Sequence, residues 1–398
     1  MKLSWLIPDD RSGGVAATAA ACCEEASAQG HEATLLAVLP LTRGGRIGGC
    51  SAVSLELPEP AAEASARLLA WLATHPTDVL LLNGCEQVDD VAPYLPSSCR
   101  CVYVVHDTAG RYWRAALAHE SDFEAIVAVS ETVAAKFRHR LREPGKLRVI
   151  HNGGRFPEPA PDLALPRADR LLFFGGDNIH KGAGDVLRVW RALLAQGFAG
   201  SLDWLGAMNP EFRGQVEALP EAGRIEIHGR VGRDAVFPIA GRCKAILALT
   251  RAESFGLATL EAMSMGCVPV AWDIETGTKE ICRAEESGLF APVGDVRAYA
   301  RQTMRACAEH GRFVEEVVRR ARQDFPRERM WSGYAALFDE LGRAVPRAQR
   351  SRAGEQPAPY RPRKRRFQLL PAALRQRARR LIERSPWLGS LLRDLRGV

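Results

Sequence analysis

The residues best suited to chemistry stand in a loop between an apolar strand candidate, 245–250, and a helix candidate, 256–265. The loop contains Glu253, Ser254 and Phe255 and ends at Gly256. A helix that begins directly after a strand presents unpaired backbone N–H groups and the positive end of its dipole. We therefore expect this loop to bind an anionic group such as a diphosphate.

Two glutamates frame the start of this helix. Glu253 precedes the helix, where a carboxylate would repel phosphate, so we expect it to accept hydrogen bonds from neutral hydroxyls such as those of a sugar. Glu261 follows about one turn into the helix, at ~1.5 Å of rise per residue, which suits the hydroxyls of a ribose. The alternative is structural, with Glu253 capping the helix and Glu261 at a solvated helix position.

Short apolar runs alternate with longer helical stretches along most of the chain. The strand candidates are 3–7, 33–39, 79–83, 101–106, 125–129, 171–175, 202–205, 225–229, 245–250 and 268–272. The helix candidates between them are 14–29, 61–73, 131–141, 184–196, 256–265 and 296–310. This alternation predicts an α/β fold, with parallel sheets covered by crossover helices.

The β/α alternation runs twice and is interrupted at 153–169, where four prolines favour an interdomain linker. We expect ligands beyond the carboxyl ends of the strands, in a cleft that both doubly wound domains face. We predict an acceptor-side domain over 1–155, a linker over 156–169 and a donor domain over 170–325. A helix over 326–342 is expected to return to the first domain, and a basic tail follows over 343–398.

The loop and its helix also resemble a family signature. The matching residues are Glu253, Ser254, Phe255, Gly256, Leu257, Glu261 after seven intervening residues, Ala262, Met263, Gly266, Cys267, Val268, Pro269 and Val270. This pattern resembles that of the family 4 retaining glycosyltransferases, and the resemblance extends over about residues 1–341. It implies a GT-B fold of two Rossmann-like domains. It also implies that Glu253 holds the donor sugar, and that the donor is bound by Ser254, Phe255, Gly256, Leu257 and Glu261.

Three further segments match the family in order. Gly13 and Gly14 resemble its glycine loop at the donor diphosphate, although a glycine pair can equally be a turn. His106 resembles the histidine that reaches the donor sugar, although a histidine at a strand end can be structural. Lys181 resembles the lysine on the diphosphate, where a flexible point charge can follow the charge that develops as the sugar departs. The resemblance thus implies that Glu253, Lys181 and His106 are catalytic.

The chain departs from the family pattern at Gly176, where the family usually has an arginine. One cation for the phosphates is therefore missing, unless His180, Arg230 or Arg251 replaces it.

The resemblance implies a retaining glycosyltransferase of the hexosyltransferase type (EC 2.4). It would move a sugar from a UDP- or GDP-sugar to a glycan or lipid-linked acceptor in cell-surface polysaccharide synthesis. The nucleotide-sugar is a co-substrate, and no metal or other cofactor is expected, because helix ends and cations take up the diphosphate charge. The alternatives are a non-catalytic nucleotide-sugar- or glycan-binding GT-B protein, or a nucleotide-sugar epimerase. The second needs a proton-transferring constellation, which we do not find in the sequence.

Charge is concentrated at the end of the chain. The 398 residues carry a net charge of +7, yet 345–398 alone contain fifteen basic and three acidic residues, so the rest is mildly acidic. A proline- and arginine-rich stretch through Arg366, expected to be disordered, precedes an arginine-rich amphipathic stretch that includes Trp387. We expect 345–398 to contact an anionic membrane surface. The alternatives are a solvated tail or a nucleic-acid contact, and no nucleic acid is expected because aromatic interleaving is missing.

We expect a cytoplasmic protein, which the basic tail would hold at the inner face of the plasma membrane. The ten cysteines contain neither a C-x-x-C pair nor a zinc pattern, which fits free thiols in a reducing compartment. Cys243 and Cys267 lie in apolar runs and are expected to be buried. No apolar run approaches the roughly 18–20 residues that a membrane-spanning helix needs.

Overall fold

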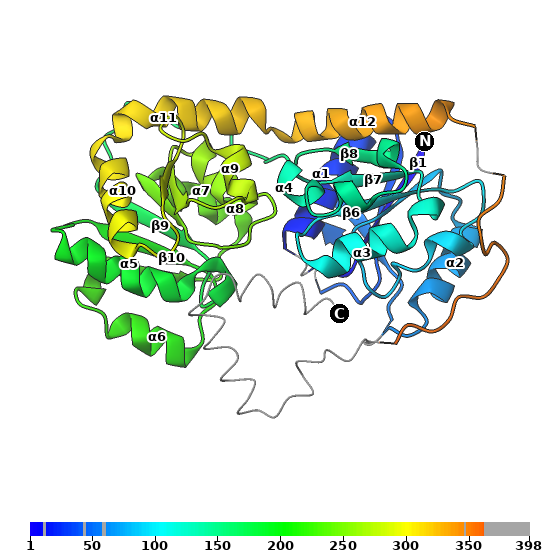
Figure 1. Ribbon diagram of the computed structural model, residues 1–398, viewed down its shortest axis with the longest axis horizontal. Coiled ribbons are helices and arrows are strands. Elements are labelled where there is room, and N and C mark those ends of the chain that lie inside the picture. The colour runs from blue at the N-terminus through cyan, green and yellow to red at the C-terminus, as the bar shows by residue number, and fades with distance from the viewer. Residues whose placement is uncertain (11–12, 43–44, 58–60, 346–347, 362–398) are drawn as a thin grey trace. The chain divides into compact units, whose positions relative to one another are not determined.

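The computed structural model describes residues 1–10, 13–42, 45–57, 61–345 and 348–361 (Figure 1). The chain forms two compact units, the first from Met1–His151 and the described residues from Met330 onward, the second from Asn152–Arg329. Each unit contains one largely parallel sheet with helices on its faces, which confirms the predicted α/β class. The amphipathic stretch predicted after Arg366 lies outside the described residues.

The first unit contains an eight-stranded sheet in the order β3-β4-β2-β1-β5-β6-β7-β8. All neighbouring strands are parallel except the β3 and β4 pair. The chain order reverses between the neighbours β1 and β5, and ligands of doubly wound sheets bind at such switch points. The strands are β1 (Lys2–Ile7), β2 (Glu32–Ala37), β3 (Arg46–Ile47), β4 (Cys50–Ser54), β5 (Val79–Leu82), β6 (Arg100–Val105), β7 (Ala125–Ala128) and β8 (Leu147–Val149).

The second unit contains a six-stranded parallel sheet in the order β11-β10-β9-β12-β13-β14. Here β9 and β12 are the neighbours between which the chain order reverses. The strands are β9 (Arg170–Phe174), β10 (Ser201–Leu205), β11 (Ile225–Gly229), β12 (Ala245–Ala248), β13 (Val268–Trp272) and β14 (Leu289–Ala291).

Helices cover both sheets. In the first unit they are α1 (Gly14–Ala28), α2 (Ala64–Thr74), α3 (Gly110–Ala118), α4 (Glu131–Ala134) and most of α12 (Arg327–Arg343). In the second unit they are α5 (Ala183–Ala195), α6 (Pro210–Glu217), α7 (Arg233–Gly241), α8 (Leu257–Ser264), α9 (Gly277–Ile281), α10 (Val296–Ala308) and α11 (His310–Arg319).

Alternating side chains divide the core of the second unit into two layers. Leu171 and Phe173 of β9 pack on the face that carries Trp190 of α5. Leu172, between them, packs on the opposite face with Ala240 of α7. Because both faces are covered, the central strands are apolar on both sides, which is why their sequences were readable as strands.

Helix α12, orange in Figure 1, packs its apolar stripe into the core of the first unit. Its buried side chains recur every three or four residues, as on one face of a helix. The ring of Phe338 meets that of Trp5 in β1 edge to face, with centroids 6.1 Å apart. The buried residues are Met330, Trp331, Tyr334, Leu337, Phe338 and Leu341.

Two sequence expectations are wrong. The helix predicted over 131–141 ends at Ala134. Beyond this point Phe137 is buried in the core, whereas Lys136 and Arg140 are exposed. A continued helix would bring the like charges of Lys136 and Arg140 together, since they are four residues apart. The disorder predicted through Arg366 does not hold for 348–361, which pack on the first unit and bury Arg350.

The described part of the chain contains no helix that combines the length and the apolar character needed to cross a bilayer. All ten cysteines are unpaired and buried, as expected for Cys243 and Cys267.

An ion network crosses the outer strands of the second sheet. The Asp203 side chain in β10 is fully buried, and its carboxylate accepts hydrogen bonds from Arg170 at 2.9 Å, Arg242 at 2.5 Å and His228 at 2.7 Å. Glu226, half exposed on β11, lies 3.0 Å from both arginines. Burial alone would raise the pKa of Asp203, but the bonds from His228, Arg242 and Arg170 outweigh it and hold the pKa below its usual value.

Asp203→Asn is expected to lower the free energy of unfolding of the second unit by about 3 kcal/mol at neutral pH, because two arginines lose their buried partner. A carboxyl whose pKa is lowered by folding stabilises the protein above its unfolded pKa of about 3.9 and stops doing so as the pH falls through the folded value. The difference from wild type should therefore shrink below about pH 4, as denaturant unfolding at several pH values would measure.

Glu226→Gln is the matched control, since its carboxylate is half exposed and should contribute at most about 1 kcal/mol. Equal losses in the two variants at neutral pH would contradict the central role of Asp203.

Candidate functional site

Two loops meet at the carboxyl ends of β9 and β12, the switch point of the second sheet. The first loop follows β9, contains Lys181 and Gly182, and leads into α5. The second follows β12, contains Glu253, and leads into α8. Residues far apart in the sequence therefore share one sheet edge because their strands are neighbours.

Lys181 and Glu253 form an ion pair across these loops. The Lys181 Nζ lies 2.8 Å from the Glu253 Oε2. The glutamate side chain is 17% exposed and the lysine side chain 42% exposed, so the pair is reached from solvent chiefly on the lysine side. The structure thus brings together two residues that the sequence predicted to be catalytic.

The backbones of the two loops touch beside this pair. A Cβ on Gly182 would lie 2.6 Å from the carbonyl oxygen of Leu249, so only glycine permits this approach, and its φ of +91° also favours glycine. The Thr250 hydroxyl donates to the carbonyl of His180 at 3.0 Å. The ion pair therefore stands on loops that are fixed to each other.

The start of α8 adds backbone donors to the same edge. Gly256 precedes the first helical residue, Leu257, and the N–H groups of the first turn point out of the helix start. The carbonyl of Glu253 accepts a 2.7 Å hydrogen bond from the backbone N–H of Gly277, which holds the loop in place. This arrangement suits an anionic ligand.

The predicted donor-binding residues differ in what they offer. The ring of Phe255 is buried against Phe325, with centroids 5.6 Å apart, so Phe255 can offer a ligand only its backbone. Glu261 is also buried, at 7% exposure on α8, so it is not a solvated helix position. Ser254 and Leu257 are partly exposed on either side of Gly256.

Gly176 is required by its surroundings. Its φ is +53°, and a Cβ would lie 2.0 Å from the carbonyl oxygen of Ala207. Its own carbonyl accepts a 2.9 Å hydrogen bond from the indole of Trp204. An arginine therefore cannot occupy this position in this backbone conformation.

The three candidate replacements for that arginine, Arg251, Arg230 and His180, differ in how well they could supply a positive charge near Gly176. Arg251 lies 2.6 Å from the buried Asp185 of α5, so its charge is already balanced. Arg230 follows β11, two strands from β9 and thus about 10 Å across the sheet at ~4.8 Å per strand. His180 is exposed and directly precedes Lys181, which makes it the best placed of the three.

In the first unit, Gly13 and Gly14 follow β1 at the switch point and are exposed at the start of α1. His106 follows β6, one strand beyond β5. The structure describes these residues within the first unit and the Lys181 and Glu253 pair within the second.

The protonation of His106 follows from its partner, Asn83. The Asn83 amide nitrogen donates to the carbonyl of Leu6 at 3.0 Å, so its oxygen faces the His106 Nε2 at 2.8 Å. Nε2 therefore carries the proton, and Nδ1 is an acceptor. Burial lowers the pKa of His106 to about 4, so the imidazole is neutral at physiological pH. Sequence reasoning placed Asn83 in a strand and missed this role, although a polar residue that ends an apolar run was a usable signal.

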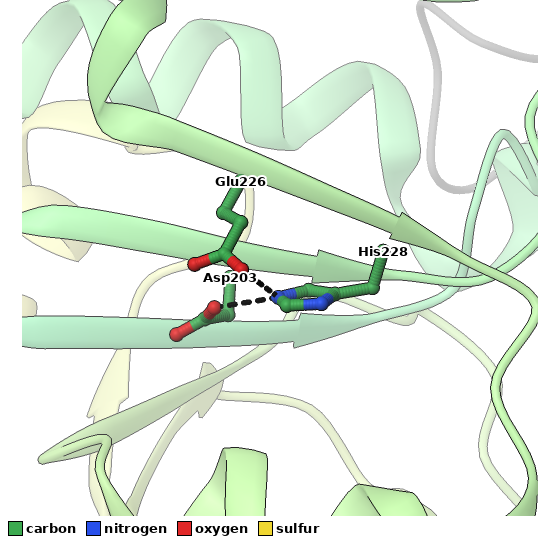
Figure 2. A group of neighbouring side chains, drawn as sticks. All are labelled: Asp203, Glu226 and His228. Carbon is green, nitrogen blue, oxygen red and sulfur yellow. Dashed lines mark hydrogen bonds and ion pairs between the residues drawn. The ribbon is translucent and has the colours of Figure 1, made fainter.

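A possible metal-binding group exists away from these loops. Asp203, Glu226 and His228 bring one ligand atom each within 4.8 Å of one another, as Figure 2 shows. Arg170 and Arg242 already contact these carboxylates. Because two guanidinium groups supply the positive charge that a metal ion would bring, the group is an ion network rather than a suitable metal site.

Family comparisons agree with this architecture. The model described as Glycosyltransferase Family 4 matches residues 12–153, and the model described as Glycosyl transferases group 1 matches residues 168–309. Together they cover more than half of the chain. The chain is 25% identical over 222 residues to the GDP-mannose:cellobiosyl-diphosphopolyprenol alpha-mannosyltransferases of Xanthomonas campestris and Xanthomonas oryzae. The match covers 54% of this chain and about half, 55%, of the length of these relatives.

Solved structures share the fold at low sequence identity. Sucrose-phosphate synthase from Thermosynechococcus elongatus has a TM-score of 0.72 at 17% identity, covering 87% of this chain and all of that one. HepE from Anabaena, in complex with UDP and glucose, has a TM-score of 0.68 at 15% identity, covering 85% and 99%. WaaG, a glycosyltransferase involved in lipopolysaccharide biosynthesis, has a TM-score of 0.65 at 16% identity, covering 86% and 100%. The chain has the GT-B fold and belongs to glycosyltransferase family 4, group 1.

Proposed function

We propose that this protein is a retaining glycosyltransferase of the hexosyltransferase type that uses a UDP- or GDP-sugar. The observation that carries the proposal is the ion pair of Lys181 and Glu253, set beside the start of α8 at the switch point of the second sheet. A cation, backbone N–H groups and a carboxylate at one edge are what a diphosphate bonded to a sugar requires.

Donor binding would open this ion pair. The diphosphate would replace Glu253 as the partner of Lys181, and sugar hydroxyls would become hydrogen-bond donors to the freed carboxylate. The charge on Lys181 is thus compensated by Glu253 before binding and by the diphosphate after it. The other proposed donor contacts come from Gly13, Gly14, the backbone amides of Ser254 to Leu257, and Glu261. We propose His180 as the replacement for the missing arginine.

The proposed reaction is a displacement on one face of the sugar. The bond between C1 and the phosphate oxygen breaks while a bond forms between C1 and the acceptor oxygen. The departing phosphate oxygen takes the acceptor proton, so no protein base is needed. Lys181 and the helix start stabilise the negative charge as it develops. His106, neutral with an acceptor at Nδ1, can receive a hydrogen bond from a sugar hydroxyl without adding charge.

The relatives support the substrate classes without fixing them. Two related proteins are named for GDP-mannose and for a diphosphopolyprenol-linked acceptor, and HepE was solved with UDP and glucose. We therefore propose a glycan or lipid-linked acceptor in cell-surface polysaccharide synthesis. In this proposal the protein works at the cytoplasmic face of the membrane, which it contacts through its basic tail, and needs no metal.

A non-catalytic donor-binding protein is the second candidate, because Gly176 excludes the usual arginine. Incubation with a panel of UDP- and GDP-sugars, with and without membrane extract as acceptor source, would separate the two. Release of nucleoside diphosphate in the presence of acceptor supports the enzyme, whereas binding without release supports the second candidate.

Glu253→Gln and Lys181→Met should each reduce nucleoside diphosphate release by at least about 100-fold, because each removes a charge that acts on the reacting donor. Glu217→Gln is the matched control, since this glutamate forms an exposed ion pair on α6 and its loss should leave turnover unchanged. Thermal melting would verify that all variants fold. Wild-type turnover in either site variant would contradict the assigned roles.

A further inference from the structure

Residues 348–361, here called the strap, are anchored to the first unit by a buried arginine. The Arg350 side chain is 1% exposed and lies 3.0 Å from the Glu124 carboxylate. Its guanidinium also donates to the carbonyl of Cys99 at 2.6 Å and to that of Asp122. The Ser351 hydroxyl donates to the Asp122 carboxylate at 3.1 Å. A buried charge with this many partners fixes the strap firmly, because releasing it would leave Glu124 without its cation.

The anchor lies at the amino edge of the first sheet. Cys99 directly precedes β6, Glu124 directly precedes β7, and Asp122 lies three residues before β7. The two strands are parallel neighbours, so their starts share one edge. Arg350 is therefore held at the edge opposite to the one that carries His106.

The strap then runs to the carboxyl edge. The Arg352 backbone N–H donates to the carbonyl of Pro93 at 3.0 Å, and its guanidinium lies 4.8 Å from the centre of the Tyr94 ring. Near the end of the strap, the Tyr360 backbone N–H donates to the carbonyl of Ala62 at 2.7 Å.

Tyr360, near the end of the strap, lies at the carboxyl edge of the first sheet. Burial first, and then the neighbouring carboxylate of Glu86, raise the pKa of the Tyr360 hydroxyl to about 12. Glu86 comes four residues after the last residue of β5, in the loop that begins with Asn83, the partner of His106. The strap thus ends beside the loop that supports His106.

The chain that continues from this point is strongly basic. Residues 362–398 contain eleven basic and two acidic residues, a net charge of +9, together with Trp387 and several leucines. Each basic residue near an anionic bilayer contributes about 1 kcal/mol of attraction. The leucines and the tryptophan favour a lipid surface over a nucleic acid, because they can bury apolar area in the bilayer. Arg350, by contrast, is committed to the first unit and adds nothing to the tail's exposed charge.

We propose that the strap fixes the origin of the basic tail at the carboxyl edge of the first sheet, so that an anionic lipid bilayer bound by residues 362–398 is held at that edge. The inference rests on the proposed function, in which this edge receives a lipid-linked acceptor. The strap is then a positioning element: it determines which side of the first unit faces the bilayer, not whether the protein binds.

The test measures which edge of the full-length protein approaches a vesicle. The ten native cysteines are buried, so a fluorophore can be attached selectively to Arg111→Cys, after the carboxyl end of β6, or to Arg142→Cys, before the start of β8. The vesicles contain phosphatidylcholine and phosphatidylglycerol with a rhodamine-labelled lipid as energy acceptor. The proposal predicts clearly higher energy transfer from position 111 than from position 142.

Two variants release the tail from its fixed origin. Arg350→Ala removes the anchor, and a twenty-residue Gly/Ser insertion after Arg361 leaves the strap intact while adding a reach of about 25 Å. Both should still float with the vesicles but lose most of the difference between the two labels. The insertion does not disturb the packing of the first unit, so it tests the proposal even where Arg350→Ala fails to fold. Arg213→Ala, an exposed arginine on α6, is the control that should keep the difference.

The outcomes separate this inference from the proposed function. If the wild-type protein does not float with the vesicles, the membrane contact in the proposed function is wrong, and this inference is wrong with it. A wild-type protein that floats with equal transfer from both labels overturns the strap proposal alone. So does a difference that survives both variants. Loss of flotation on deleting 362–398, with the difference abolished in both variants, supports it.

Discussion

The ion pair between Lys181 and Glu253 is the interaction on which the proposed chemistry of the second unit depends. Two opposite charges 2.8 Å apart keep each other compensated at a partly exposed edge. The same two charges are the ones that a diphosphate and a sugar would use, so ligand binding exchanges partners rather than exposing an unpaired charge. The neighbouring start of α8 adds the N–H groups of the first helical turn to the same edge.

Backbone contacts that only glycine permits hold this pair in place. Gly182 lets the loop after β9 lie against Leu249 at the end of β12, so the lysine and the glutamate cannot drift apart. Gly176, in the same loop, approaches Ala207 so closely that no side chain fits. The geometry that positions Lys181 is thus incompatible with the arginine that the family usually carries at position 176. The cation that the structure does place at this edge is Lys181, 2.8 Å from Glu253.

Local sequence patterns predicted the central elements and failed where distant residues decide. The central strands of both sheets were readable because buried parallel strands are apolar on both faces, whereas the short outer strands β3, β4, β8 and β14 were missed. The spacing of Glu253 and Glu261 singled out the loop before α8. The pairing of Lys181 with Glu253 depends on β9 and β12 being neighbours, which no local pattern encodes. Arg350 stands in a stretch with the composition of disorder, yet partners more than 200 residues earlier in the chain bury it. Its order is a tertiary effect that composition cannot reveal.

Calorimetric titration of UDP and GDP into the protein tests the central claim most directly, because it asks whether the diphosphate competes with Glu253 for Lys181. A nucleoside diphosphate without its sugar gains nothing from the glutamate. The account therefore predicts opposite effects: Glu253→Gln frees the lysine and tightens binding of the accepted nucleotide, whereas Lys181→Met weakens it. Unchanged affinity in both variants, or weaker binding in Glu253→Gln, would contradict the claim that this ion pair is the donor site.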